Sequence, residues 1–293
     1  MQLGFFIFNQ ICLVVVNFNG AITAQPETAI QNNRAFLYGD AVFETMRVLD
    51  GRILFAEDHY FRLMASMRIL RMEIPMYFTP EYMSQQVTAL LDAMGDAPAW
   101  RVRLTVYRQG GGYYLPETND TGFIITASPL TDAVYVSGQL PYEADLYRDF
   151  YVAKQLLSTL KTANRAINIT GSIYAAENGL QDCFLINDEK NVIEALRGNI
   201  FMLMGNRLIT PPLSDGCLNG IMRKQVLAIA RKIEGLEVSE ASISPFDLQK
   251  ADELFVTNVI TGIQPVTRYR KKEYGYDTSS EIMKRLNAQV RLG

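Results

Sequence analysis

Residues 160–165 read Leu-Lys-Thr-Ala-Asn-Arg and place Lys161 directly after an apolar lead-in that contains Leu156, Leu157 and Leu160. An arbitrary lysine is usually a solvated surface residue. Burial and neighbouring cations, however, favour the neutral form of a lysine amine. The lead-in therefore makes Lys161 a candidate reactive amine, and the rest of the sequence must decide between the two interpretations.

The composition is that of a globular protein: of 293 residues, 48% are apolar, 20% charged and 11% aromatic. This length predicts about two domains. The net charge of −3 argues against nucleic acid as the main partner. With His59 as the one histidine, a multi-histidine metal site is excluded, and a serine or cysteine triad would need His59. Cys12, Cys183 and Cys217 form no CxxC pair, so we expect no metal, no disulfide framework and a reducing cytoplasm.

The N-terminus is strongly apolar over residues 3–16, although Asn9 and Gln10 interrupt this run. The run is too short to span a bilayer, and no basic residue precedes Arg34. We therefore expect neither a membrane segment nor a signal peptide. Cys12–Phe18 reads as a first strand, whereas residues 1–10 could be a vestigial or over-called start.

The first part of the chain alternates predicted strands and helices. Strands are expected at Val42–Leu49 and Arg52–Phe55 on either side of an Asp-Gly turn. Asp58 is expected to cap a helix over 59–72, and a second helix should cover 80–94. Apolar and polar residues alternate over Arg101–Tyr107, as in a half-buried strand. A glycine-rich loop and a strand at Gly122–Ala127 follow.

Residues 129–138 read as a linker to a larger second domain. Helices are expected over Asn164–Asn178, over 221–233 and from Pro245. The predicted strands of this part are Cys183–Asn187, Asn199–Met204 and Glu253–Asn258. We therefore predict an α/β (α+β) protein with domains at 1–128 and 139–293 and a ligand crevice between them.

Several other stretches accompany residues 160–165 in a fixed order. They are residues 38–47 (YGDAVFETMR), 59–63 (HYFRL), 194–199 (EALRGN), 218–223 (LNGIMR) and 251–258 (ADELFVTN). Together they resemble the fold-type IV pyridoxal-phosphate enzymes, which include the class IV aminotransferases and the aminodeoxychorismate lyases. The resemblance implies a two-domain fold of the D-amino-acid and branched-chain aminotransferase type, with the cofactor at the domain interface.

The resemblance also implies roles for residues that would hold pyridoxal 5′-phosphate. Lys161 would form the Schiff base with its aldehyde, and Glu194 would keep the pyridine nitrogen protonated so that the ring can accept electrons. Arg62 would bind the phosphate with paired hydrogen bonds. The remaining cofactor-binding residues that it implies are Asn199, Gly220, Ile221, Met222, Thr257, Asn258 and Val259. Among these, Gly220 would open a helix whose free N–H groups face the phosphate.

The substrate side is less specific. Arginines at positions 47, 101, 103 and 108 are candidates for the substrate carboxylates, although each arginine taken alone is more often a surface or structural charge. Arg108 is the first choice, because related enzymes place a carboxylate-binding arginine at this loop. Phe43 and Arg197 are also assigned to substrate binding, and Tyr113 and Tyr114 could form a wall of the pocket.

Two reactions share these residues. In both, Lys161 would take a proton from the substrate carbon as general base. Residues 160–165 and 218–223 look more like lyase sequences, and Thr45 stands where some lyases carry a threonine that aids elimination. The first expectation is therefore cleavage of 4-amino-4-deoxychorismate to 4-aminobenzoate and pyruvate.

Arg197, in place of a small residue, and Gly262, in place of an acidic one, would equally mark an aminotransferase of unusual substrate range. The alternative function is therefore an amino-acid aminotransferase of the branched-chain or D-amino-acid type that uses 2-oxoglutarate. A non-catalytic scaffold that binds the cofactor is a remote third alternative. The resemblance further implies a small amino-acid-like substrate and a homodimer in which a loop of each subunit completes the neighbouring cleft.

Overall fold

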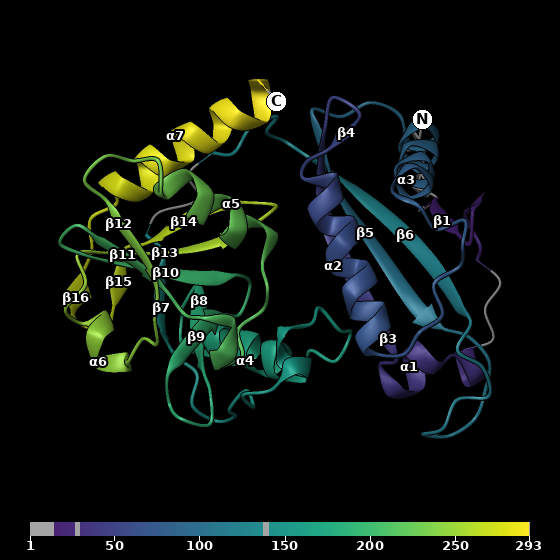
Figure 1. Ribbon diagram of the computed structural model, residues 1–293, viewed down its shortest axis with the longest axis horizontal. Helices are drawn as coiled ribbons and strands as arrows, with labels where there is room; N and C mark the ends of the chain where they lie inside the picture. The colour runs from purple at the N-terminus through teal and green to yellow at the C-terminus, as the bar shows by residue number, and fades with distance from the viewer. Residues whose placement is uncertain (1–14, 27–29, 137–140, 293) are drawn as a thin grey trace, which may run out of the picture.

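The computed structural model describes residues 15–26, 30–136 and 141–292. The described strands form three sheets, one from residues 16–130 and two from residues 143–273, in a mixed α/β fold. Figure 1 shows the first sheet in one lobe and the other two sheets in a second lobe. The predicted mixed α/β class is thus confirmed. We propose the division into domains at 1–128 and 139–293, which this distribution of strands supports.

The first sheet has the strand order β2-β1-β6-β5-β3-β4, and all of its pairings are antiparallel. Its strands are β1 (Val16–Phe18), β2 (Ala21–Thr23), β3 (Ala41–Leu49), β4 (Arg52–Ile53), β5 (Ala99–Arg108) and β6 (Thr121–Leu130). Helices α2 (Ala56–Ile69) and α3 (Pro80–Met94) pack against it, and together they bury an apolar core. A short 3-10 turn, η1 (Ile30–Asn32), and helix α1 (Arg34–Tyr38) precede β3.

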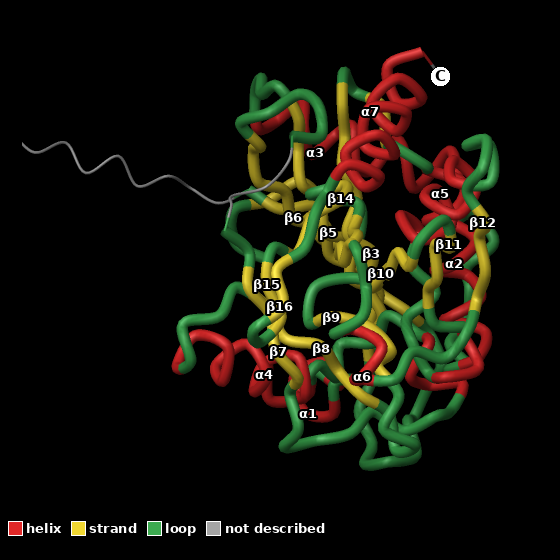
Figure 2. The backbone as a smooth tube through the Cα atoms, turned by 90° about the vertical axis from the view of Figure 1, so that its left-hand side faces the viewer, coloured by secondary structure: helices red, strands yellow, loops and turns green. Residues whose placement is uncertain are grey.

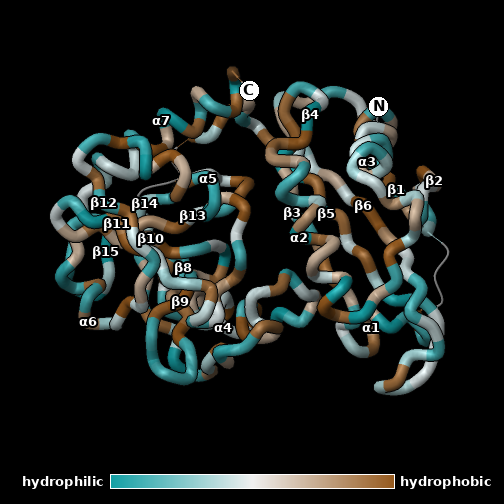
Figure 3. The backbone as a smooth tube through the Cα atoms, in the orientation of Figure 1, coloured by the Kyte–Doolittle hydropathy of each residue, from teal (hydrophilic) through white to brown (hydrophobic). Residues whose placement is uncertain are grey.

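The alternation of apolar and polar residues along β5 determines which of its side chains face the second lobe. Val102, Leu104 and Val106 are buried in the core with α2 and α3. Because neighbouring side chains of a strand point to opposite faces, Arg101 and Arg103 lie on the other face. In the register of the sheet, Arg101 lies opposite Arg47 of β3, and Arg103 lies opposite Thr45. Brown, hydrophobic residues recur along β3, β5 and β6 in Figure 3.

Most boundaries in this half match the sequence, with three corrections. Helix α2 covers Ala56–Ile69 instead of 59–72, and its N-cap is Phe55 at φ 59° rather than Asp58. The strand expected at Arg52–Phe55 ends at Ile53, because the chain turns directly into α2. Strand β6 continues to Leu130, into the expected linker. Only 16–18 of the first expected strand are described as β1; residues 1–14 lie outside the described residues.

The second lobe consists of two five-stranded sheets. One has the order β12-β11-β10-β13-β14 and the other β16-β15-β7-β8-β9. Their strands are β7 (Glu143–Leu146), β8 (Asp182–Ile186), β9 (Val192–Ala195), β10 (Asn199–Met204), β11 (Arg207–Thr210), β12 (Glu237–Glu240), β13 (Glu253–Asn258), β14 (Gly262–Val266), β15 (Arg268–Tyr269) and β16 (Lys272–Glu273). Buried apolar residues of both sheets form one cluster, so the sheets pack face to face.

Helices surround these sheets, as the red segments outside the yellow strands in Figure 2 show. They are α4 (Ala166–Glu177), α5 (Ile221–Ala230), α6 (Pro245–Leu248) and α7 (Asp277–Leu292), with 3-10 turns η2 (Leu156–Thr159) and η3 (Leu213–Asp215). The predicted helices at 164–178, 221–233 and 245 are confirmed with shifted ends, whereas α7 was not predicted. Among the described residues, no helix combines the length and the hydropathy needed to cross a bilayer.

Candidate active site

A cavity of about 410 Å³ lies between the first sheet and the second lobe. The first sheet contributes Phe43, Thr45, Arg101 and Arg103 to its wall, and helix α2 contributes Arg62. The second lobe contributes Lys161, Glu194, Arg197, Asn199, Gly220, Ile221, Met222, Thr257, Asn258 and Val259, among others. Thirteen of the predicted site residues, far apart in the sequence, therefore meet at one cavity, although the predicted residues Arg47 and Arg108 do not.

Backbone pairing with β3 fixes the position of Lys161. The N–H of Phe43 donates to the carbonyl of Lys161 at 2.9 Å, and the N–H of Ala163 donates to the carbonyl of Ala41 at 2.8 Å. The Nζ atom of Lys161 lies 4.6 Å from the centre of the Phe43 ring. Burial, followed by the nearby guanidinium groups of Arg62 and Arg165, lowers the pKa of Lys161 from 10.5 to about 7. The amine can therefore be neutral near neutral pH.

Glu194 is a buried carboxylate near the end of β9. Its Oε2 atom accepts a hydrogen bond from the N–H of Leu218 at 2.8 Å. Burial raises the pKa of Glu194, while that hydrogen bond, Arg165 and Lys161 act in the opposite direction. The structure thus places Lys161 and Glu194 at the same cavity, within electrostatic reach of each other.

The loop before α5 brings the free N–H groups of that helix to the cavity. Gly220 is the N-cap of α5 and provides no side chain to the free N–H groups of the first turn. A Cβ atom at position 220 would lie 1.9 Å from Oδ1 of Asn199, so any larger residue would displace the Asn199 side chain. Asn199 in turn holds the loop, because its Nδ2 atom donates to the carbonyl of Leu218 at 2.8 Å. The N-terminus of α5 can consequently accept a phosphate from the cavity.

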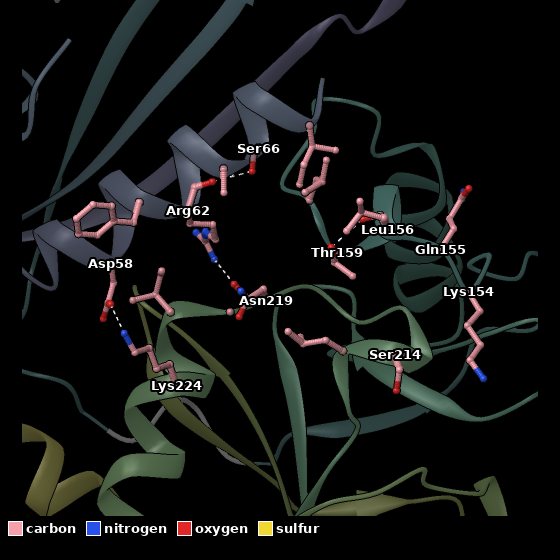
Figure 4. A pocket seen from close by; sticks show the side chains of 17 residues that line it. Asp58, Arg62, Ser66, Lys154, Gln155, Leu156, Thr159, Ser214, Asn219 and Lys224 are labelled. Atoms are coloured by element: carbon pink, nitrogen blue, oxygen red, sulfur yellow. Dashed lines mark hydrogen bonds and ion pairs between the residues drawn. The ribbon is translucent and has the colours of Figure 1, made fainter. Parts of the chain in front are cut away.

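Arg62 reaches the same loop from the other lobe. Its NH1 atom donates to the carbonyl of Asn219 at 2.9 Å, and its remaining bonds go to Glu44. Figure 4 shows Arg62 pointing toward Asn219, in a neighbouring cavity of about 730 Å³ that shares Arg62, Gly220 and Ile221 with the first one. In the same view Lys224 of α5 pairs with Asp58 of α2.

The donor set fits pyridoxal 5′-phosphate. A buried amine of lowered pKa can bind an aldehyde, and a buried carboxylate can accept a hydrogen bond from a ring N–H. The glycine-capped start of α5 and Arg62 together provide donors for a phosphate. Asn258 is engaged differently: its Oδ1 atom accepts the N–H groups of Ile260 and Thr261, so its side chain shapes the turn beside the cavity.

Besides Arg165, whose donors bind the carbonyls of Leu160 and Thr162, three arginines of the cavity have no carboxylate partner within ion-pair distance in the part of the chain that the structure describes. They are Arg101, Arg103 and Arg197. Arg103 lies over the Phe43 ring at 3.7 Å. Burial and repulsion by Arg101 and Arg165 lower the pKa of Arg103. An excess of positive charge in a partly buried cavity indicates an anionic ligand.

Arg47 and Arg108, two expected substrate ligands, serve other groups. Arg47 donates to the carbonyls of Asp132, Val134 and Ile260 and thereby ties β3 to the linker and to the second lobe. Arg108 pairs with Asp40 at 2.9 Å, and its other donors bind Asn119 and the carbonyls of Leu70 and Arg71. Both guanidinium groups are buried among protein acceptors.

The aromatic loop also differs from the expectation. Tyr113 and Tyr114 are 84% and 93% exposed and do not line the cavity of Lys161 within this chain. Arg34 holds the base of their loop by donating to the carbonyls of Gly111, Gly112 and Tyr113.

Sequence reasoning missed several residues of the site. Arg165 lines the cavity and lies only four positions after Lys161, and its side chain binds the carbonyls of Leu160 and Thr162. Glu44 and His59, which lie behind Arg62, belong to the stretches 38–47 and 59–63, whose resemblance implies no role for either residue. A signal was present, because His59 and Arg62 are three positions apart and therefore adjacent on a helix.

Comparisons with known proteins agree with this arrangement. The family model for amino-transferase class IV matches residues 41–269. Over 262 residues and 88% of each chain, the protein is 30% identical to one from Methanocaldococcus jannaschii that is provisionally named a branched-chain-amino-acid aminotransferase. It is 26% identical to a D-alanine aminotransferase of Listeria monocytogenes, over 87% of this chain and 86% of the relative.

Two solved structures share the fold. The branched-chain amino acid aminotransferase of Thermobaculum terrenum, in its pyridoxal-phosphate form, has a TM-score of 0.82 at 23% identity and 94% and 93% coverage of the two chains. A Legionella pneumophila protein, provisionally named a 4-amino-4-deoxychorismate lyase, has a TM-score of 0.79 at 24% identity and 90% and 96% coverage.

Proposed function

Because the chain belongs to the class IV aminotransferase family, whose enzymes use pyridoxal 5′-phosphate, we propose that it cleaves 4-amino-4-deoxychorismate to 4-aminobenzoate and pyruvate. The observation that carries this proposal is the set of three unpaired arginines at the cavity of Lys161. This substrate has two carboxylates, and arginine binds a carboxylate with two parallel hydrogen bonds. A purely aliphatic side chain would leave most of this charge without a partner.

We assign the cofactor to the residues around Lys161. When bound, pyridoxal 5′-phosphate supplies an aldehyde for the substrate amine and a ring that takes up the electron pair of a broken bond. Glu194 would accept the hydrogen bond of the ring N–H and hold that proton in place. Arg62 and the first turn of α5 would bind the phosphate.

Lys161 is the proposed general base. Its pKa of about 7 leaves the free amine partly neutral at neutral pH, so that Nζ can take the proton from the carbon that bears the substrate amine. Thr45 lies opposite Arg103 in the sheet and also lines the cavity. We propose that its hydroxyl gives a proton to the enolpyruvyl group as the carbon–oxygen bond between that group and the ring breaks, so that pyruvate leaves. The proton that Lys161 has taken from the substrate carbon then replaces the one lost by Thr45.

Amino exchange is the second candidate, and the names of the relatives favour it. The relatives above are named as branched-chain and D-alanine aminotransferases. The unpaired arginines also suit 2-oxoglutarate, which has two carboxylates. In this alternative the same Lys161 would return the proton to the cofactor and a keto acid would leave.

One pair of assays separates the two reactions. The holoenzyme is incubated with 4-amino-4-deoxychorismate, and pyruvate and 4-aminobenzoate are measured. In parallel it receives leucine, glutamate or D-alanine with a keto acid, and amino exchange is measured. We expect pyruvate release that is lost in Lys161→Ala. Amino exchange without pyruvate release would refute the lyase proposal in favour of the second candidate.

Arg197→Ala tests the arginines directly. It should raise the KM for a dicarboxylate substrate by about ten- to a hundredfold, because a charged hydrogen-bond partner is lost. Arg68→Ala is the matched control, since Arg68 is an exposed arginine of α2 outside the cavity. Equal KM values in both variants would show that Arg197 does not bind the substrate.

We further propose a homodimer in the cytoplasm. Tyr113, Tyr114 and Leu115 are almost fully exposed on a loop whose base is fixed by Arg34, which favours burial against a second subunit. Cys183 and Cys217 are free and buried, in keeping with a reducing compartment.

A further inference from the structure

A buried pair of side chains lies directly behind Arg62. Glu44 is on β3 and 1% exposed, and His59 is on α2 and fully buried. The Nδ1 atom of His59 lies 2.6 Å from Oε2 of Glu44. The Nε2 atom of His59 has no hydrogen-bond partner among the described residues, so this imidazole interacts with polar groups only through Glu44.

Glu44 binds one edge of the Arg62 guanidinium group. Nε donates to Oε1 at 2.7 Å and NH2 donates to Oε2 at 2.5 Å, which is the paired geometry of an arginine and a carboxylate. NH1 donates to the carbonyl of Asn219. A guanidinium group has five N–H donors, so two of them, one on NH1 and one on NH2, remain for a ligand.

We propose that Glu44 and His59 are positioning residues that hold Arg62 with its two remaining N–H groups directed at the phosphate site beside Gly220. The inference rests on the proposed role of Arg62 in binding the cofactor phosphate. Glu44 fixes the plane of the guanidinium group, and His59 fixes the carboxylate by donating to Oε2. A donor that is already oriented loses less conformational entropy when the ligand binds, which increases affinity.

Charge alone predicts the opposite effect for Glu44. Its negative charge repels a phosphate, so removing the charge should strengthen phosphate binding if orientation did not matter. Glu44→Asp separates the two effects, because it keeps the charge but withdraws the oxygens from Arg62 by about one carbon–carbon bond. The positioning role predicts weaker phosphate binding in both Glu44→Asp and Glu44→Gln.

The experiment compares the affinity of the cofactor-free protein for pyridoxal 5′-phosphate and for pyridoxal, which lacks the phosphate. Both are titrated by absorbance. The dissociation constant of pyridoxal divided by that of pyridoxal 5′-phosphate gives the preference for the phosphorylated compound and isolates the phosphate contribution. Arg62→Met should lower this ratio and so verify the role of Arg62. His59→Leu removes the donor to Glu44, whereas His59→Asn restores a donor near the Nδ1 position. Ser66→Ala is the control, because Ser66 is a buried residue of α2 whose hydroxyl donates to the Arg62 carbonyl and to no other group among the described residues.

We expect the preference for the phosphorylated compound to fall by about ten- to a hundredfold in Glu44→Asp, Glu44→Gln and His59→Leu. It should return in His59→Asn and stay unchanged in Ser66→Ala. Urea unfolding identifies any variant that does not fold, and the folded variants then test the positioning role. An unchanged preference in folded His59→Leu and Glu44→Asp, or a stronger one in Glu44→Gln, overturns the positioning role alone. No binding of either compound by the wild-type protein, or no effect of Arg62→Met, overturns the assignment of Arg62 and the inference with it.

Discussion

Replacing Lys161 with methionine should change how the stability of the cofactor-free protein depends on pH. In the folded chain, burial and the nearby guanidinium groups lower the pKa of Lys161 from 10.5 to about 7. Between these two values the unfolded chain binds a proton that the folded chain has lost. Stability therefore rises with pH across this window, and below pH 7 the cost of burying the charged amine is fully present.

The size of the effect follows from the shift. At about 1.4 kcal/mol per pKa unit, the full difference amounts to about 5 kcal/mol. The part that falls between pH 7 and pH 9 is about 2 kcal/mol. Lys161→Met has a similar volume and no titrating amine, so it should lack this rise and be more stable than the wild-type protein at pH 7.

Urea unfolding of both cofactor-free proteins at several pH values from 6 to 9 measures this difference directly. Other groups titrate in both proteins, so the difference between the two curves reports on Lys161. Parallel curves, or a wild-type protein that loses stability relative to Lys161→Met as the pH rises, would refute the claim that the folded chain holds this amine largely neutral.

Three further outcomes are expected. Gly262→Ala should lower the free energy of unfolding by about 2–3 kcal/mol, because Gly262 has φ 73° and an added Cβ would lie 2.9 Å from the Tyr135 ring. Gly205→Ala is the control: Gly205 has φ 60° and an added Cβ would meet no atom within 4 Å, so the variant should lose only about 1 kcal/mol. Equal urea midpoints for the two glycine variants would contradict this. Arg47→Met should cost about 3 kcal/mol in urea unfolding, since it removes a buried guanidinium group that donates to three partly buried carbonyls, and a loss below about 0.5 kcal/mol would speak against this role of Arg47. Leu115→Glu should convert the proposed dimer into a monomer in sedimentation experiments, and a dimer that persists would show that this loop lies outside the interface.

Local patterns predicted the parts of the fold that depend on neighbouring residues. The alternation over 101–107 identified β5 and its polar face, and the apolar spacing over 59–72 identified α2. The start of α2 was misplaced, because Phe55 adopts a left-handed conformation without a side-chain cap and Asp58 instead binds Lys224 of the other lobe. Such a tertiary partner leaves no local signal.

The same limit explains which residues of the candidate site could be predicted from the sequence. Lys161, Glu194 and the glycine before α5 could be found because motifs mark them. Arg47 and Arg108 could not be distinguished from ligand-binding arginines, because the carbonyl acceptors that bind them come from distant loops. A sequence gives the charge of a side chain but not the distant groups that will pair with it.

The backbone pairing of Lys161 with β3 has a consequence for protein engineering. The reactive lysine is encoded in the later half of the chain, yet its main chain is hydrogen-bonded to the sheet of the earlier half. A chimaera that exchanges whole halves between relatives at the linker would combine a lysine segment from one parent with the strand edge of another. Grafts from other family members should therefore transfer residues 41–43 and 161–163 as one unit, even though more than a hundred positions separate them in the gene.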